Sequence, residues 1–192
     1  SDFLISCVPS TPIRHDMNNE TCLATRNPQQ LHQLTTRDRA QIMDKPDFTR
    51  FYPHDDLTSL LRKYVSSFPK LAALESIGKS HEGRDIWALT ITNQETGPSI
   101  EKPGFYVDGN IHGSEVTAST TALYWAWTLL SGYGEDVALT RLVNDCAFYI
   151  IPVISPDGVE LVLTGGGHAR SGTRMYPHEE ERDGLHPEDI DG

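Results

Sequence analysis

A histidine and a glutamate lie three residues apart, at His112 and Glu115, in a stretch that also contains glycines. In a tight turn that enters a helix, side chains at this spacing can point to the same place. One imidazole and one carboxylate can supply two of the three protein ligands of a catalytic zinc ion, whose fourth position holds water. Gly109 and Gly113 allow the chain to turn there and leave room for a substrate.

The same spacing has a second interpretation, because a His-x-x-Glu pair also occurs by chance. Glu115 could instead stabilise the first amides of a helix as part of a capping box, with Ser114 or His112 before it. The pair falls between a predicted strand and a predicted helix. This context supports the metal site, and both interpretations stay open at this point.

The elements that must position the pair follow from the spacing of apolar residues. Gly104–Asp108 predicts a short strand just before it, and a helix is predicted from Ser114 to Gly132. The apolar run Cys146–Ile154 lacks alternation, which predicts a central strand buried on both faces. The turn residues Pro156, Asp157 and Gly158 follow this run.

Further strands and helices flank this part of the chain. Apolar spacing predicts a helix that opens at Asp55, which can cap it, and another helix over Asp136–Asn144. Leu74–Ser80 and Asp85–Thr92 predict a hairpin, with Gly83 in the turn. Strands that alternate with helices predict an α/β fold with a mixed sheet, in which sites lie at strand ends.

Composition excludes several classes of protein. The 192 residues are 38% hydrophobic and carry a net charge of −11, so a packed core is expected and a general nucleic-acid binder is not. No apolar run approaches the roughly 18 residues that a membrane span needs. The acidity is concentrated in the tail from Glu179 to Gly192, which has seven acids and one base.

The first 50 residues lack a sustained apolar period and are interpreted as a linker or a loosely structured lead-in. Leu4–Cys7 is similar to the end of a lipoprotein signal, in which the cysteine is lipidated. The alternative is an accidental match. We expect an extracytoplasmic protein, whether secreted, periplasmic or lipid-anchored.

Four stretches of the sequence occur in an order and at separations that resemble the zinc carboxypeptidase family, the carboxypeptidase A-like metallopeptidases. They are Tyr52–Leu57, Ser76–Ile86, Asp108–Glu115 and Ile151–Gly158. The resemblance covers Tyr52 to Gly192 and implies an α/β domain over residues 51–192 with a mixed, mainly parallel central sheet and helices on both faces. It also implies that the chain holds about the first half of such a domain.

The resemblance implies roles for individual residues. The family binds one zinc ion through the His and Glu of this motif, which here are His112 and Glu115. The family also has an arginine that steadies the oxyanion of the tetrahedral intermediate. Arg170, twelve residues after Gly158, fits that place as a substrate-binding residue, and Arg174 is the alternative. Arg170 could otherwise be a solvated loop residue.

Other parts of the family pattern have no match here. The third zinc ligand, a histidine, and the general base, a glutamate, are expected beyond residue 192, and His168, His178 and His186 are interpreted as loop residues. The resemblance therefore implies a metallocarboxypeptidase that hydrolyses C-terminal bonds of peptides or proteins in its full-length parent. The chain itself is expected to be an inactive fragment.

Two alternatives stay open at this point. His112-Gly113-Ser114-Glu115 also resembles the His-Gly-Asn-Glu of zinc deacylases of related fold, which act on N-acyl amino acids. The stretches Gly78–Ile86 and Pro156–Gly158 favour the peptidase. The chain could also be a non-catalytic binding module that has kept half of the fold.

Overall fold

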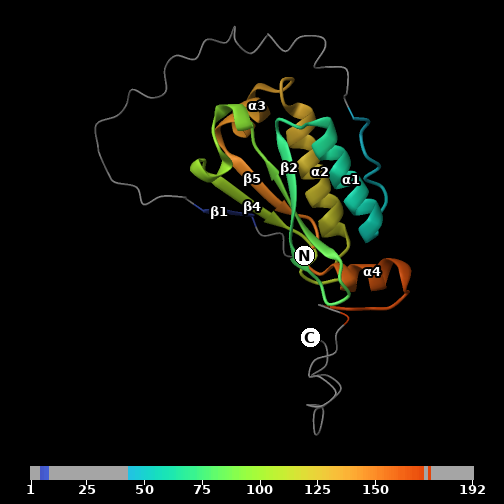
Figure 1. Ribbon diagram of the computed structural model, residues 1–192. Helices are drawn as coiled ribbons and strands as arrows, with labels where there is room; N and C mark the ends of the chain where they lie inside the picture. Colours follow the sequence, from blue (N-terminus) through green and yellow to red (C-terminus); the bar gives the residue numbers. More distant parts are fainter. Residues whose placement is uncertain (1–4, 9–42, 171–172, 174–192) are drawn as a thin grey trace.

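The structure is a computed structural model that describes residues 5–8, 43–170 and 173 (Figure 1). The described strands are β1 (Ile5–Val8), β2 (Ala72–Lys79), β3 (Asp85–Ile91), β4 (Gly104–Asp108) and β5 (Ala147–Ile151). The described α-helices are α1 (His54–Ser67), α2 (Thr117–Gly132), α3 (Val137–Asp145) and α4 (Pro156–Thr164). Two short 3-10 helices, η3 (Gln94–Thr96) and η4 (Ser99–Glu101), connect β3 to β4.

The strands form one open mixed sheet in the order β1-β4-β5-β3-β2. This confirms the predicted fold class, an α/β domain with a mixed sheet. The finer prediction of mainly parallel strands is wrong for the described sheet. β4 and β5 are parallel, whereas β1–β4, β5–β3 and β3–β2 are antiparallel. The β2–β3 hairpin forces one antiparallel pair, because a tight turn reverses the chain.

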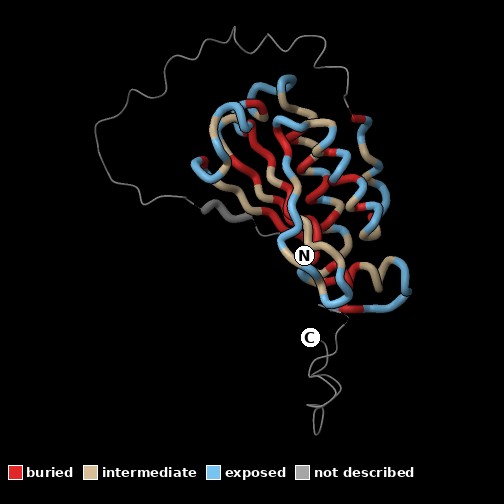
Figure 2. Tube along the Cα trace, in the orientation of Figure 1, coloured by how far each residue is buried: buried red, intermediate tan, exposed pale blue. Residues whose placement is uncertain are grey.

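The core lies between one face of the sheet and helices α1 and α2. Alternate strand residues, among them Leu89, Val107 and Ile150, are buried on this face. Figure 2 shows buried segments along the central strands and along the helices that cover them. Tyr64 of α1 donates a hydrogen bond to the carbonyl of Leu123 of α2, which joins the two helices. Helices were expected on both faces of the sheet. Among the described residues, helices α1 and α2 pack against the strands on the same face.

Helices α1, α2 and α4 begin differently from expectation. Helix α1 follows Pro53 without a side-chain cap, so Asp55 does not cap it. Helix α2 begins at Thr117, later than Ser114, because the residues between them belong to the site loop. Pro156 begins helix α4, where a simple turn was expected. Proline suits the first helical position because its fixed φ matches the helix and its missing N–H is not needed there.

The segment before residue 51 contains an element that the sequence pattern did not predict. Ile5–Val8, which includes Cys7, forms strand β1 at the sheet edge and pairs with β4. Arg174, His178, His186 and the acidic tail lie outside the described residues. In the described part of the chain, no helix has the length and apolar character needed to cross a membrane.

Candidate metal site at the end of strand β4

The site loop connects β4 to α2 and is held against the exit of β5 by backbone hydrogen bonds. Gly109 donates to the carbonyl of Ile151 (3.0 Å) and accepts from the amide of Ile154 (2.9 Å). The amide of Ser155 donates to the carbonyl of Asn110 at 3.0 Å. The two parallel strands thus continue as paired backbone beyond the sheet, which brings the loop beside the start of α4.

Asn110 turns the loop from the strand direction towards α2. Its φ is 54°, in the left-handed region that asparagine tolerates better than most residues. The residue is 2% exposed, and its side-chain Oδ1 accepts a hydrogen bond from the amide of Ser119 in α2 at 2.9 Å. One buried amide therefore sets the direction of the loop relative to the helix.

The structure brings His112 and Glu115 together. The amide of Glu115 donates to the carbonyl of His112 at 3.2 Å, which closes a turn between them. His112 Nδ1 lies 3.4 Å from Glu115 Oε2, and the two side chains are 21% and 41% exposed. Both groups are thus adjacent and reachable from solvent.

The separation of these two atoms can be compared with the needs of a zinc ion. Two ligands about 2.1 Å from a tetrahedral zinc are about 3.4 Å apart. His112 Nδ1 and Glu115 Oε2 have this separation, and an imidazole nitrogen and a carboxylate oxygen are both zinc donors. These two residues therefore fit a zinc ion as a partial ligand set. Among the described residues, no group of three or more His, Cys, Asp or Glu side chains could hold a metal.

Arg170 lies next to the loop through its backbone. Its carbonyl accepts a hydrogen bond from the amide of Gly113 at 2.5 Å, while the residue itself is exposed. Gly113 also packs closely on α4, because a Cβ atom there would lie 2.7 Å from Gly158 Cα. The loop, the start of α4 and the backbone at Arg170 are therefore in direct contact. His168, expected in a loop, is exposed and lies outside any regular element.

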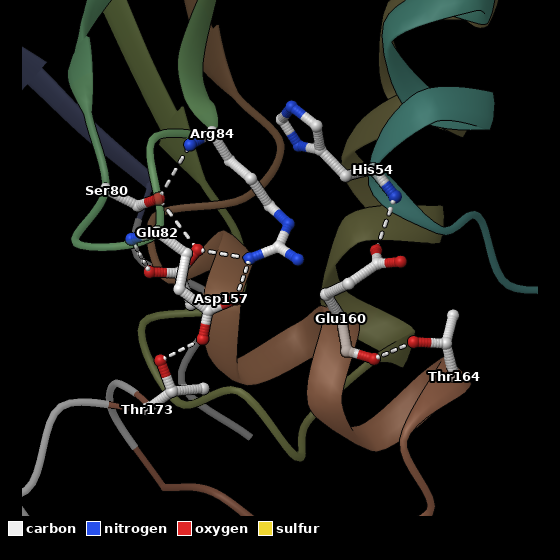
Figure 3. A network of polar contacts seen from close by, with 8 residues as sticks. All are labelled: His54, Ser80, Glu82, Arg84, Asp157, Glu160, Thr164 and Thr173. Atoms are coloured by element: carbon white, nitrogen blue, oxygen red, sulfur yellow. Dashed lines mark hydrogen bonds and ion pairs between the residues drawn. The ribbon is translucent and has the colours of Figure 1, made fainter.

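A network of polar residues beside the site had no predicted function (Figure 3). Asp157, at the start of α4, is 4% exposed and accepts from Ser80 Oγ (2.7 Å), the Glu82 amide (3.0 Å) and Arg84 Nη1 (2.7 Å). Burial acts to raise the pKa of Asp157, but these hydrogen bonds outweigh it and lower that pKa. Asp157 was expected in a turn, and the charged residues of the turn His81–Arg84 were the sequence signal for its polar partners.

A second contact joins α4 to the start of α1. The amide of His54 donates to Glu160 Oε2 at 2.9 Å. Burial lowers the pKa of the His54 imidazole, and the nearby positive charge of Arg84 adds to this, against the effect of neighbouring carboxylates. Figure 3 shows the His54 imidazole on the side that faces Arg84. Helix α4 is thus fixed by polar contacts to both the hairpin and α1.

Comparison with known proteins identifies the family. The sequence profile of the zinc carboxypeptidase family matches residues 57–187. The chain therefore belongs to the zinc carboxypeptidase family, which confirms the resemblance of its motifs.

Two curated relatives and one solved structure illustrate the likeness. Carboxypeptidase D of Drosophila melanogaster is 36% identical over 126 residues, 62% of this chain and 9% of the relative. Inactive metallocarboxypeptidase ECM14 of Saccharomyces cerevisiae is 33% identical over 129 residues, 66% of this chain and 30% of the relative. Carboxypeptidase A of Helicoverpa armigera shares the fold, with a TM-score of 0.61 and 22% identity over 79% of this chain and 37% of that chain.

The chain spans less than a third of the length of these two curated relatives. Since one of them is named inactive, family membership alone does not establish catalysis. The activity of this chain therefore depends on which of its own residues can bind zinc and substrate.

Proposed function

We propose that the chain carries part of the zinc site and part of the substrate site of a metallocarboxypeptidase. His112 and Glu115 would hold the zinc ion, and Arg170 would bind the substrate. The observation that carries the proposal is the 3.4 Å separation between His112 Nδ1 and Glu115 Oε2, which suits two ligands of one tetrahedral ion.

The chemistry divides between the metal and the chain. When bound, zinc lowers the pKa of its water to about 7 and polarises a carbonyl group. The guanidinium of Arg170 is always charged and can donate to the oxygen on which negative charge develops. Its carbonyl accepts a hydrogen bond from the Gly113 amide, so the arginine and the loop that carries His112 and Glu115 are in direct contact.

The two donors are one short of the three protein ligands that catalytic zinc takes. Hydrolysis of C-terminal peptide bonds is therefore proposed for a protein that adds a third ligand and a general base to these residues. An extracytoplasmic location also remains a proposal. The match of the family profile to residues 57–187 supports the peptidase over the deacylase.

Zinc titration of the 192-residue chain, followed by the NMR chemical shifts of its histidines, tests the site. We expect the wild type to bind one zinc ion weakly, because two protein ligands hold zinc less tightly than three, and we expect still weaker binding in His112→Ala and Glu115→Gln. His168→Ala is a matched control, because this exposed histidine belongs to no proposed ligand set. If His112→Ala retains wild-type zinc affinity, the site assignment fails.

The non-catalytic alternative makes a different prediction. A module that binds partners without metal would fold normally and take up zinc no better than His112→Ala does. Equal, weak zinc uptake by both proteins would favour that alternative over the peptidase.

A further inference from the structure

The polar network contains one residue that connects three segments around the site. Glu82, in the β2–β3 turn, accepts a hydrogen bond from Arg84 Nη1 on Oε2 (2.5 Å) and one from the Thr173 hydroxyl on Oε1 (Figure 3). Arg84 Nη1 also donates to Asp157 in α4, and the Glu82 amide donates to the same carboxylate. Glu82 is therefore bound to its own hairpin, to α4 and to Thr173.

Thr173 lies three residues after Arg170, and Arg170 contacts the metal-binding loop. The carbonyl of Arg170 is the acceptor for the Gly113 amide. The carbonyl of Ala169 lies 3.0 Å from the place where a Gly113 Cβ would be. The backbone at residues 169 and 170 is thus packed on the residue that follows His112, and a displacement of this backbone would break the Gly113 hydrogen bond.

The bond between Glu82 and Thr173 is a contact of a neutral donor with a charged acceptor, which is stronger than a bond between neutral groups. The hydrogen bond from Thr173 is the first cause, followed by that from Arg84, of a lowered pKa at Glu82. The carboxylate is 41% exposed, so solvent weakens the interaction. The bond can hold a chain segment in place without contributing much to global stability.

We propose that Glu82 is a positioning residue that, through Thr173, holds the backbone of Arg170 against the His112–Glu115 loop. Any effect of this contact on the binding of zinc and substrate rests on the proposed function. The contact itself can be tested without metal, because the Gly113 amide is bonded to the Arg170 carbonyl and reports whether that backbone stays in place.

Amide hydrogen exchange of the metal-free 192-residue chain, measured by NMR, tests the inference. We expect Thr173→Val and Glu82→Ala to speed exchange at Gly113 by about fivefold, because the supporting bond is lost. The amide of Ile150, in a fully buried residue of the central strand, serves as the global reference and should be unchanged.

Two control variants separate this effect from general damage. Thr173→Ser keeps a hydroxyl and should keep wild-type exchange at Gly113. Thr164→Val removes another threonine hydroxyl, which donates to the carbonyl of Glu160 within α4 (2.8 Å), and should also leave Gly113 unchanged. Unchanged exchange at Gly113 in Thr173→Val would overturn the inference, as would equal acceleration at Gly113 and Ile150.

A zinc titration of the same variants separates the inference from the proposed function. If the wild type binds zinc through His112, Thr173→Val should weaken that binding about as much as it speeds Gly113 exchange. A wild type that binds no zinc would defeat the proposed function, while the exchange result would still decide whether Glu82 positions the loop.

Discussion

Replacing Gly113 by alanine tests the close packing that supports the site loop between β4 and α2. A Cβ atom at this position would lie 2.7 Å from both the Cα and the carbonyl carbon of Gly158, and 3.0 Å from the carbonyl oxygen of Ala169. Optimal contacts between carbon atoms are about 3.5–4.0 Å. All these neighbours are backbone atoms, so either the loop or the start of α4 must move by most of 1 Å.

Overpacking of this kind destabilises a protein by about 1–3 kcal/mol. For a chain of this size we expect Gly113→Ala to lower the midpoint of thermal unfolding by roughly 3–10 °C. Zinc affinity should fall as well, because His112 is the preceding residue. Differential scanning calorimetry and a zinc titration measure the two effects.

Gly78→Ala is the matched control for this substitution. Gly78 lies in strand β2, and a Cβ atom there would have no neighbour within 4 Å. We expect its midpoint to stay close to the wild-type value. If Gly113→Ala unfolds at the wild-type temperature and binds zinc normally, the close contact between loop and α4 is not needed, and the reasoning is refuted.

Three further predictions concern ionisable groups. The hydrogen bonds that Asp157 accepts outweigh the effect of burial and lower its pKa below 3.8. The stability that these bonds add is complete above pH 3.8 and is lost as the pH falls through the lowered pKa. Acid unfolding curves of Asp157→Asn should lack this loss of stability. Burial lowers the pKa of Lys102 below 10.5. Between the lowered pKa and about 10.5 the unfolded chain binds more protons than the folded chain, so stability rises with pH over this interval. Denaturant unfolding of Lys102→Met at several alkaline pH values should not show this rise, and a rise parallel to that of the wild type would contradict the assignment. Burial and a hydrogen bond with Asp108 raise the pKa of Tyr106 to about 12; an ultraviolet titration of Tyr106→Phe should lose one phenol that ionises near that pH, and loss of a phenol of ordinary pKa would be evidence against it.

The parts of the fold that depend on local pattern could be predicted from the sequence. Strand β4 has the predicted bounds, and the β2–β3 hairpin turns at Gly83, whose φ is 83°. Alternation, apolar runs and turn residues are local properties, so they can be interpreted without knowledge of tertiary contacts.

The relations between distant segments could not be predicted in this way. β1 pairs with β4 across about a hundred residues of chain, and nothing in a four-residue strand specifies such a partner. The prediction of a mainly parallel sheet was wrong for a related reason. It came from the resemblance to a whole domain, whereas the described sheet is only part of such a domain and includes the antiparallel β2–β3 hairpin.

The site shows the same division. The spacing of His112 and Glu115 predicted that they could meet, and their separation of 3.4 Å agrees with that expectation. The support of the loop by Arg170 and Gly158 comes from backbone contacts between separate segments. Such contacts depend on the path of the chain rather than on residue type, so no motif revealed them.

The most direct test of the proposed site is a crystal structure of the 192-residue chain with zinc, using anomalous scattering at the zinc absorption edge. We expect one strong anomalous peak about 2.0–2.2 Å from both His112 Nδ1 and Glu115 Oε2. An anomalous peak bound by other residues, or none at this pair in crystals that contain zinc, would contradict the account.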